Sequence, residues 1–238
     1  MLLSLLSSEN IKIAIIQIIL SIPISLFALS CHEAAHAYAA YKMGDRTAFN
    51  LGRMTINPTK HLDLIGTLCM IVFGFGWAKP VPINARNFDN PKKGMAITGL
   101  AGPLANFILG IISTFLYILT SFIQIKFVMD SGASEFIFNL TTIIGSFFFL
   151  SAMYNFIFMV FNLIPIPPFD GSRFVTAFLP AKWYFKLMQY ERYSFIAILI
   201  VNIILSRVFG IYLTSFLAQK IMGLVAYPFE LLFFKILL

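Results

Sequence analysis

The sequence predicts an all-α, multi-pass membrane protein, a bundle of about four to six transmembrane helices. Of its 238 residues, 59% are hydrophobic and only 11% are charged, whereas soluble domains carry about 25% charged residues. The mean hydropathy is +0.87, and the apolar residues fall in long blocks separated by short polar stretches. Because each crossing uses about 20 apolar residues, we expect residues 1–238 to form one integral-membrane domain with its core at residues 13–180.

The first apolar block covers residues 13–41 and ends in "SCHEAAHAYAAY". It is long enough to cross a bilayer with some tilt. The alternative interpretation is a cleaved leader that ends at Cys31. A signal peptide has an apolar run of about 7–15 residues, whereas the run here is about 18. Since the helical pattern also continues beyond Cys31, a membrane span is favoured.

The second block, "LIGTLCMIVFGFGW" at residues 64–77, is too short for an ordinary crossing. Glycines interrupt it, and a polar, proline-rich loop follows at residues 78–94. Such a segment is typical of a re-entrant or interfacial position, where other parts of the protein cover its backbone. We therefore expect residues 64–77 not to cross the membrane.

Two further spans are predicted at residues 95–125 and 136–163. The first contains Gly102 and Pro103, which are expected to bend a helix and to let another backbone approach closely. The second runs into "FNLIPIPPFDG", whose prolines cannot continue a helix. The C-terminal part, about residues 194–238, is apolar but interrupted, so it allows either one span with an interfacial helix or two spans.

The formal net charge of +7 comes from lysines and arginines that gather in two stretches. Eight of them lie in residues 42–93 and four in residues 173–192, whereas residues 1–12 and 126–135 carry one each. Basic residues mark cytoplasmic loops of membrane proteins. We therefore place both stretches in the cytoplasm and expect no nucleic-acid partner.

The two cysteines, Cys31 and Cys69, both lie in apolar segments. Neither a disulfide framework nor a cysteine zinc site can be built from them.

An H-E-x-x-H sequence occupies residues 32–36 inside the first predicted span. On a helix, positions i and i+4 share one face, so His32 and His36 can bind one zinc ion while Glu33 serves as a general base. The alternative is a pair of buried histidines bonded to the backbone or to Glu33. Because ionisable groups near a membrane interior need a partner, the metal site is favoured.

A zinc ion that catalyses hydrolysis needs a third protein ligand. His61, in the polar segment "NPTKHLD", would complete a three-histidine site. Asp170 follows the prolines at the end of a predicted span, where a broken backbone can turn a carboxylate inward. Its alternative role is an ordinary Asp-Gly turn. Position favours Asp170, with His61 as the other candidate.

The chain resembles the site-2 protease family of intramembrane zinc metalloproteases (peptidase family M50), in the small form without a PDZ domain. Five blocks match in order: "HEAAH" with the following "GD", then "GRMTINPTKHLDLIGT", "GWAKPVPIN", "LAGPLAN" and "FNLIPIPPFDG". The resemblance implies a re-entrant segment beside the substrate path. The implied residues are the zinc ligands His32, His36 and Asp170 for one Zn²⁺ per chain, the catalytic Glu33 and Asn162, and the supporting His61 and Asn106.

The resemblance, the distribution of basic residues and the geometry of a helical substrate together give an expected substrate, location and way of binding. The expected partners are a transmembrane protein or peptide substrate and membrane lipid. The expected location is a prokaryotic inner membrane, with the active site toward the cytoplasm. A substrate helix must unwind before cleavage, and its backbone could then pair with an exposed strand edge near residues 50–60 or 73–84.

A zinc-binding membrane protein without proteolytic activity, either a transporter or a scaffold, is the alternative function. Transport needs ionisable residues spread along a path through several spans. Here they gather around one H-E-x-x-H sequence and one aspartate, which favours hydrolysis.

Overall fold

The computed structural model describes residues 11–73, 76–129, 134–180 and 212–236, with residues 193, 194, 197, 198, 200, 201 and 204. Four helices in this part of the chain are long and apolar enough to cross a membrane. They are α2 (Ile11–Lys42), α5 (Pro91–Ile123), α6 (Glu135–Asn162) and α10 (Leu213–Glu230). The π-helical turns Gln124–Met129 and Leu231–Ile236 extend α5 and α10. The described residues contain no strand, which confirms the predicted all-α membrane fold.

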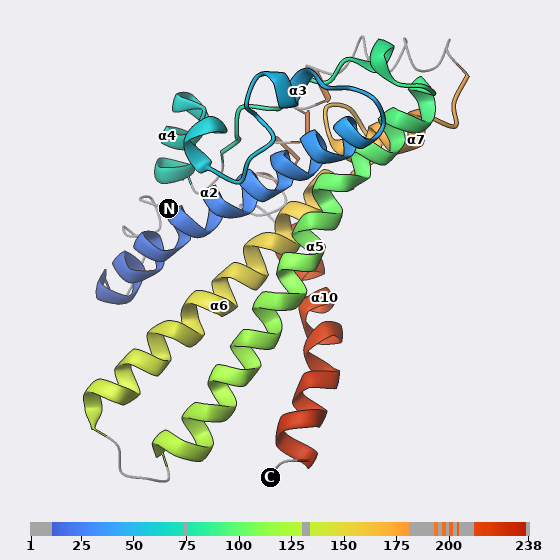
Figure 1. Ribbon diagram of the computed structural model, residues 1–238. Helices are drawn as coiled ribbons and strands as arrows, with labels where there is room; N and C mark the ends of the chain where they lie inside the picture. The colour runs from blue at the N-terminus through green and yellow to red at the C-terminus, as the bar shows by residue number, and fades with distance from the viewer. Residues whose placement is uncertain are drawn as a thin grey trace.

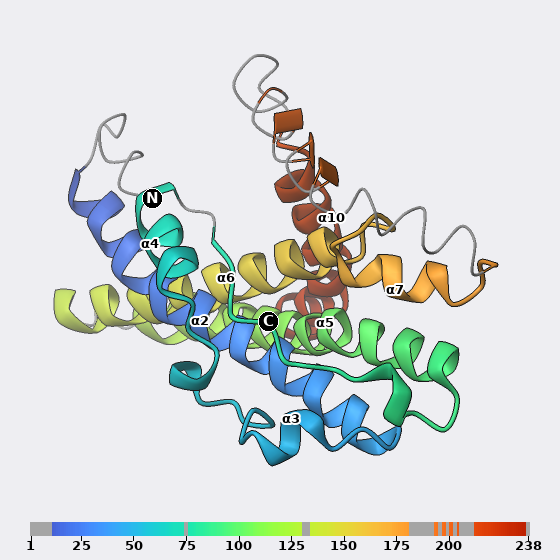
Figure 2. The same cartoon turned by 90° about the horizontal axis from the view of Figure 1, so that it is seen from above.

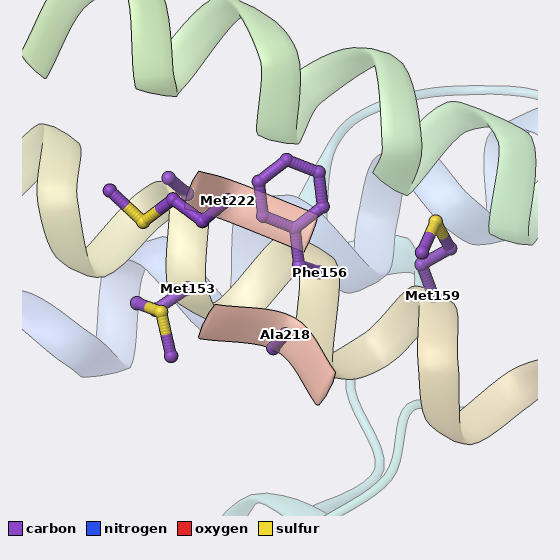
Figure 3. Packing of buried hydrophobic residues seen from close by; sticks show 6 residues of the cluster. Met153, Phe156, Met159, Ala218 and Met222 are labelled. Carbon is purple, nitrogen blue, oxygen red and sulfur yellow. The ribbon is translucent and has the colours of Figure 1, made fainter. Parts of the chain in front are cut away.

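The helix α5 is the centre of the bundle. It packs against α6, α10 and α2, and α2 crosses α5 and α6 obliquely (Figure 1). The main apolar cluster joins α6 to α10, and the ring of Phe156 points from it toward α5 (Figure 3). Its members are Ala152, Met153, Phe156, Met159, Ala218 and Met222. Because lipid is as apolar as these side chains, close packing holds such helices together.

Short elements gather at the end of the bundle where α2 and α6 end and α5 begins (Figure 1). They are α3 (Thr47–Asn50), α7 (Asp170–Thr176) and the 3-10 turn Ala85–Asn87. The 3-10 turn Pro58–Lys60 and α4 (Leu64–Phe73) lie farther back along α2, toward its middle (Figure 1). Seen from above, α7 lies beside the first turns of α5 (Figure 2). Arg173 in α7 therefore lies at the same end of the bundle as Lys42, which ends α2, and the lysines in the first turn of α5.

The predicted boundaries hold for α2 and α6 but not for α5, which begins at Pro91 rather than near residue 95. The side chain of Asn90 accepts a hydrogen bond from the N–H of Lys93, and Pro91 occupies the first helical position. Both features favour a helix start, and the first turn therefore includes two lysines. The helix also continues through Pro103 as one element.

The segment at residues 64–77 contains the helix α4 (Leu64–Phe73), which has only 10 residues. Such a helix is about 15 Å long, half of the hydrocarbon thickness. It therefore does not span the membrane, as predicted. The expected C-terminal helices are described only in part: α10 supplies one long helix, and most of residues 195–211 lie outside the described residues.

Candidate metal centre

Three side chains from α2 and α7 converge on one point. The Nε2 atoms of His32 and His36 are 2.9 Å apart, and they lie 2.9 and 3.0 Å from Oδ2 of Asp170. All three residues are buried. The histidines follow one another by one turn of α2, whereas Asp170 is the first residue of α7, brought there by the proline-rich turn after α6.

The helix α5 supplies an acceptor to each imidazole. Oδ1 of Asn106 lies 2.5 Å from Nδ1 of His32, and the carbonyl of Thr98 lies 2.6 Å from Nδ1 of His36. The Thr98 carbonyl can only accept, so Nδ1 of His36 carries a hydrogen and Nε2 carries a lone pair. A metal-binding histidine is oriented in this way when its other ring nitrogen donates its hydrogen to an acceptor.

The arrangement of these atoms fits a zinc ion. Lone pairs of nitrogen and carboxylate oxygen that meet within 3.0 Å of one another repel unless a cation lies between them. Zinc bonds of about 2.0–2.2 Å place tetrahedral ligand atoms about 3.3 Å apart, a few tenths of an ångström from the observed separations. Two imidazoles and a carboxylate are also a ligand set that zinc prefers.

Gly102 of α5 leaves the room that a metal needs. A Cβ atom at this position would lie 2.5 Å from Nε2 of His32 and 2.5 Å from Nε2 of His36. Any other residue would thus put a carbon atom against both ligand nitrogens. The glycine of "LAGPLAN" therefore opens the face of α5 that covers the three ligand atoms.

Glu33 lies next to the ligands on α2, and its Oε2 accepts a 2.8 Å hydrogen bond from the N–H of Val81. Val81 stands between Pro80 and Pro82, so its N–H is the only backbone donor of the three residues. The guanidinium of Arg53 donates to the carbonyls of Lys79 and Pro80. The segment is thereby fixed against α2.

The prediction of an exposed strand edge near residues 50–60 or 73–84 is wrong for the described residues of these ranges. They contain no strand there. Prolines remove the donors at positions 80 and 82, Glu33 takes the donor of Val81, and Arg53 takes two of the carbonyls. An added strand would find these groups already bonded.

The Asp170 carboxyl is buried, and burial disfavours its charged form unless a positive group lies near it. Arg173, one turn along α7, has Nη1 3.9 Å from the other carboxylate oxygen. Asp170 is thus kept as a carboxylate, the form that binds metal.

Comparison with known proteins decides the family. Residues 18–206, more than three quarters of the chain, match peptidase family M50. The chain belongs to peptidase family M50. This M50 peptidase is 39% identical over 175 residues to YwhC of Bacillus subtilis (strain 168), named as a candidate zinc metalloprotease, and the match covers 74% of this chain and 76% of that protein. No solved structure matches the chain.

The M50 fold brings together most of the residues predicted from the sequence. His32, His36 and Asp170 form the centre, with Glu33 beside it and Asn106 bonded to His32. Membership of this family of zinc metalloproteases agrees with that ligand set.

His61 is not part of the centre. It is buried in the segment before α4, its Nε2 donates to the carbonyl of Thr55 at 2.7 Å, and its own carbonyl accepts from Lys79. In the described part of the chain, the group of side chains that could hold a metal consists of His32, His36 and Asp170. The structure therefore places His61 apart from the other two histidines, among the polar loops, and favours Asp170 as the third ligand.

Asn162 is the last residue of α6, and its amide donates to the carbonyl of Phe158 at 3.0 Å. Its catalytic role remains a prediction. Three contacts of the site were not predicted from the sequence. Thr98 contacts His36, Val81 contacts Glu33, and Asn155 contacts Asn106. Of these, only Val81 had a recognisable pattern in the sequence: in "KPVPIN" the two prolines leave a single backbone N–H between them.

Proposed function

We propose that this M50 peptidase is an intramembrane zinc metalloprotease that hydrolyses peptide bonds within or near transmembrane segments. His32, His36 and Asp170 hold one zinc ion per chain. The observation that carries the proposal is the convergence of three buried ligand atoms within 3.0 Å of one another. Two of them, and the neighbouring Glu33, belong to α2, which is long enough to span a membrane.

Zinc at this centre supplies Lewis-acid chemistry, which lowers the pKa of a bound water toward about 7 and polarises the substrate carbonyl. Glu33 takes a proton from the attacking water as the new C–O bond forms. It then gives that proton to the amine nitrogen as the C–N bond breaks. The N–H of Val81 fixes one oxygen of Glu33, so the other is the one that handles the proton.

Asn162 is the proposed donor to the oxyanion. Its amide nitrogen carries two hydrogens, so one can stay on the Phe158 carbonyl while the other reaches the substrate. Removal of one such donor costs about 3–4 kcal/mol of transition-state stabilisation in other hydrolases.

The proposed substrate is a transmembrane protein or peptide that reaches the centre from the lipid. Its carbonyls are hydrogen-bonded within a helix, so local unwinding precedes cleavage. We place the enzyme in a prokaryotic inner membrane with the centre toward the cytoplasm, since Lys42, Lys92, Lys93 and Arg173 lie at the end of the bundle that holds the centre.

The test compares Glu33→Gln with Glu135→Gln. Glu135 is a matched control because it lies in the first turn of α6, at the opposite end of that helix from Asn162. Each full chain is reconstituted with a library of labelled transmembrane peptides, and cleavage and bound zinc are measured. We expect Glu33→Gln to keep zinc and lose cleavage, and Glu135→Gln to keep both. Cleavage by Glu33→Gln at the wild-type rate, or no chelator-sensitive cleavage by the wild type, would overturn the proposal and favour a transporter or scaffold.

A further inference from the structure

A line of buried amides connects α6 to the metal centre across α5. The amide nitrogen of Asn155 donates to the carbonyl of Ser151 at 2.8 Å, and its oxygen accepts from the amide nitrogen of Asn106 at 3.0 Å. Oδ1 of Asn106 faces Nδ1 of His32 at 2.5 Å. Asn155, Asn106 and His32 are 2%, 0% and 3% exposed, so water does not replace these contacts.

The far end of this line fixes the direction of every hydrogen bond in it. A backbone carbonyl only accepts, so the Asn155 nitrogen must face Ser151 and its oxygen must face Asn106. The Asn106 nitrogen therefore points at Asn155, and its oxygen points at His32. That oxygen can only accept, so Nδ1 of His32 carries the hydrogen.

The two histidines differ in how their orientation is secured. His36 faces the Thr98 carbonyl, which belongs to the backbone of α5 and cannot turn over. His32 faces a side-chain amide, whose oxygen and nitrogen exchange places on rotation by half a turn. A rotated Asn106 would offer N–H to His32 and leave Nε2 protonated, a form that cannot bind zinc.

We propose that Asn155 is a positioning residue that holds Asn106 in one orientation and thereby sets the metal-binding tautomer of His32. A second acceptor, the carbonyl of Ala28, also contacts the Asn106 nitrogen, but at 3.3 Å rather than 3.0 Å. Asn155 is thus the stronger of the two constraints. The inference rests on the proposed zinc site, but the hydrogen that Asn106 requires on Nδ1 of His32 is independent of metal, because Asp170 and His36 face only the other ring nitrogen.

The variants separate the polarity of the side chain from its packing. Asn155→Leu has a similar shape but offers no acceptor to Asn106. Asn155→Asp, neutral when buried in the membrane region, donates its O–H to Ser151 and accepts from Asn106, as the amide does. The matched control is Ser113→Ala, which removes a 2.9 Å hydroxyl bond to Ser151 between the same two helices but leaves the line of amides intact.

Two measurements on the full chain test the inference. The chain has three histidines, so ¹⁵N NMR of metal-free, ¹⁵N-histidine-labelled protein in lipid resolves their tautomers, and the His32 signal is the one missing in His32→Gln. Zinc affinity is measured in parallel by competition with a chromogenic chelator. We expect the wild type, Asn155→Asp and Ser113→Ala to show a hydrogen on Nδ1 of His32, whatever the protonation of Nε2, and equal zinc affinity.

For Asn155→Leu we expect His32 signal without a hydrogen on Nδ1 and about 10–100-fold weaker zinc binding, the range typical of outer-sphere residues. Asn155→Ala repeats the test should the leucine variant fail to fold. The wild-type tautomer in a folded Asn155→Leu or Asn155→Ala variant would overturn the inference. If the wild type binds no zinc, the proposed function fails, while the tautomer in these variants still decides the role of Asn155.

Discussion

The backbone N–H of Val81 donates a 2.8 Å hydrogen bond to Oε2 of Glu33, although 48 residues separate them in the sequence. The contact fixes the proposed general base from outside its own helix. The side chain of Val81 is buried against Ala37 and Ala48, so the segment cannot easily withdraw.

Val81→Pro should slow cleavage about tenfold or more while zinc stays bound. The substitution removes the N–H, and hydrogen bonds to charged groups contribute about 1.5–3 kcal/mol. Steady-state cleavage of a reconstituted peptide and the zinc content per chain are the measurements. Pro82→Ala is the control, since it keeps the N–H of Val81. A Val81→Pro variant that cleaves at the wild-type rate would show that the bond does not serve catalysis.

Asp170→Ala should lower bound zinc by at least about tenfold, because it removes one of three ligands. His61→Ala should keep zinc but melt at a lower temperature, since the carbonyl of Thr55 loses its partner. Elemental analysis and thermal unfolding in detergent measure the two effects. The reverse result, with zinc lost in His61→Ala and kept in Asp170→Ala, would restore the three-histidine site.

Gly102→Ala should abolish zinc binding without unfolding the protein. Its new methyl group would lie 2.5 Å from both ligand nitrogens. The control is Gly145→Ala in α6, where a Cβ would meet its nearest neighbour, Cγ2 of Thr120, at 3.8 Å, an ordinary contact. Zinc titration of both variants decides the point, and equal affinity would mean that α5 does not cover the metal.

Asp45 should stabilise the loops at the end of α2 in a pH-dependent way. Burial alone would raise its pKa, but hydrogen bonds from Thr47, Asn84 and Asn87 lower that pKa below the ordinary value. A lowered pKa in the folded state stabilises the protein above the unfolded pKa of about 3.9, and this stability disappears as the pH falls through the folded pKa.

The melting temperature of Asp45→Asn should therefore lie below that of the wild type at neutral pH, with a gap that narrows below about pH 4. Asp89→Asn is the control, because Asp89 is exposed. A gap of the same size at both pH values would assign the effect of Asp45 to packing rather than to charge.

Local patterns in the sequence were sufficient for the helices and for two of the three ligands. Hydropathy over about 20 residues identifies a span, and α2 and α6 match their predicted blocks within two residues. The His32 and His36 side chains share a face of one helix because the spacing i, i+4 is a property of the helix itself. The start of α5 was missed because hydropathy alone ignores the cap of Asn90.

Sequence position favoured Asp170 over His61 as the third ligand, but only the tertiary structure shows which distant groups meet at the centre. Asp170 reaches His32 across 138 residues, Asn155 reaches Asn106 across 49, and Val81 reaches Glu33 across 48. These contacts depend on where α2 crosses α5 and α6 and on the path of the loops at one end of the bundle (Figure 1). Periodicity reports which face of a helix is apolar, but it carries no information about which residue of another helix that face will meet.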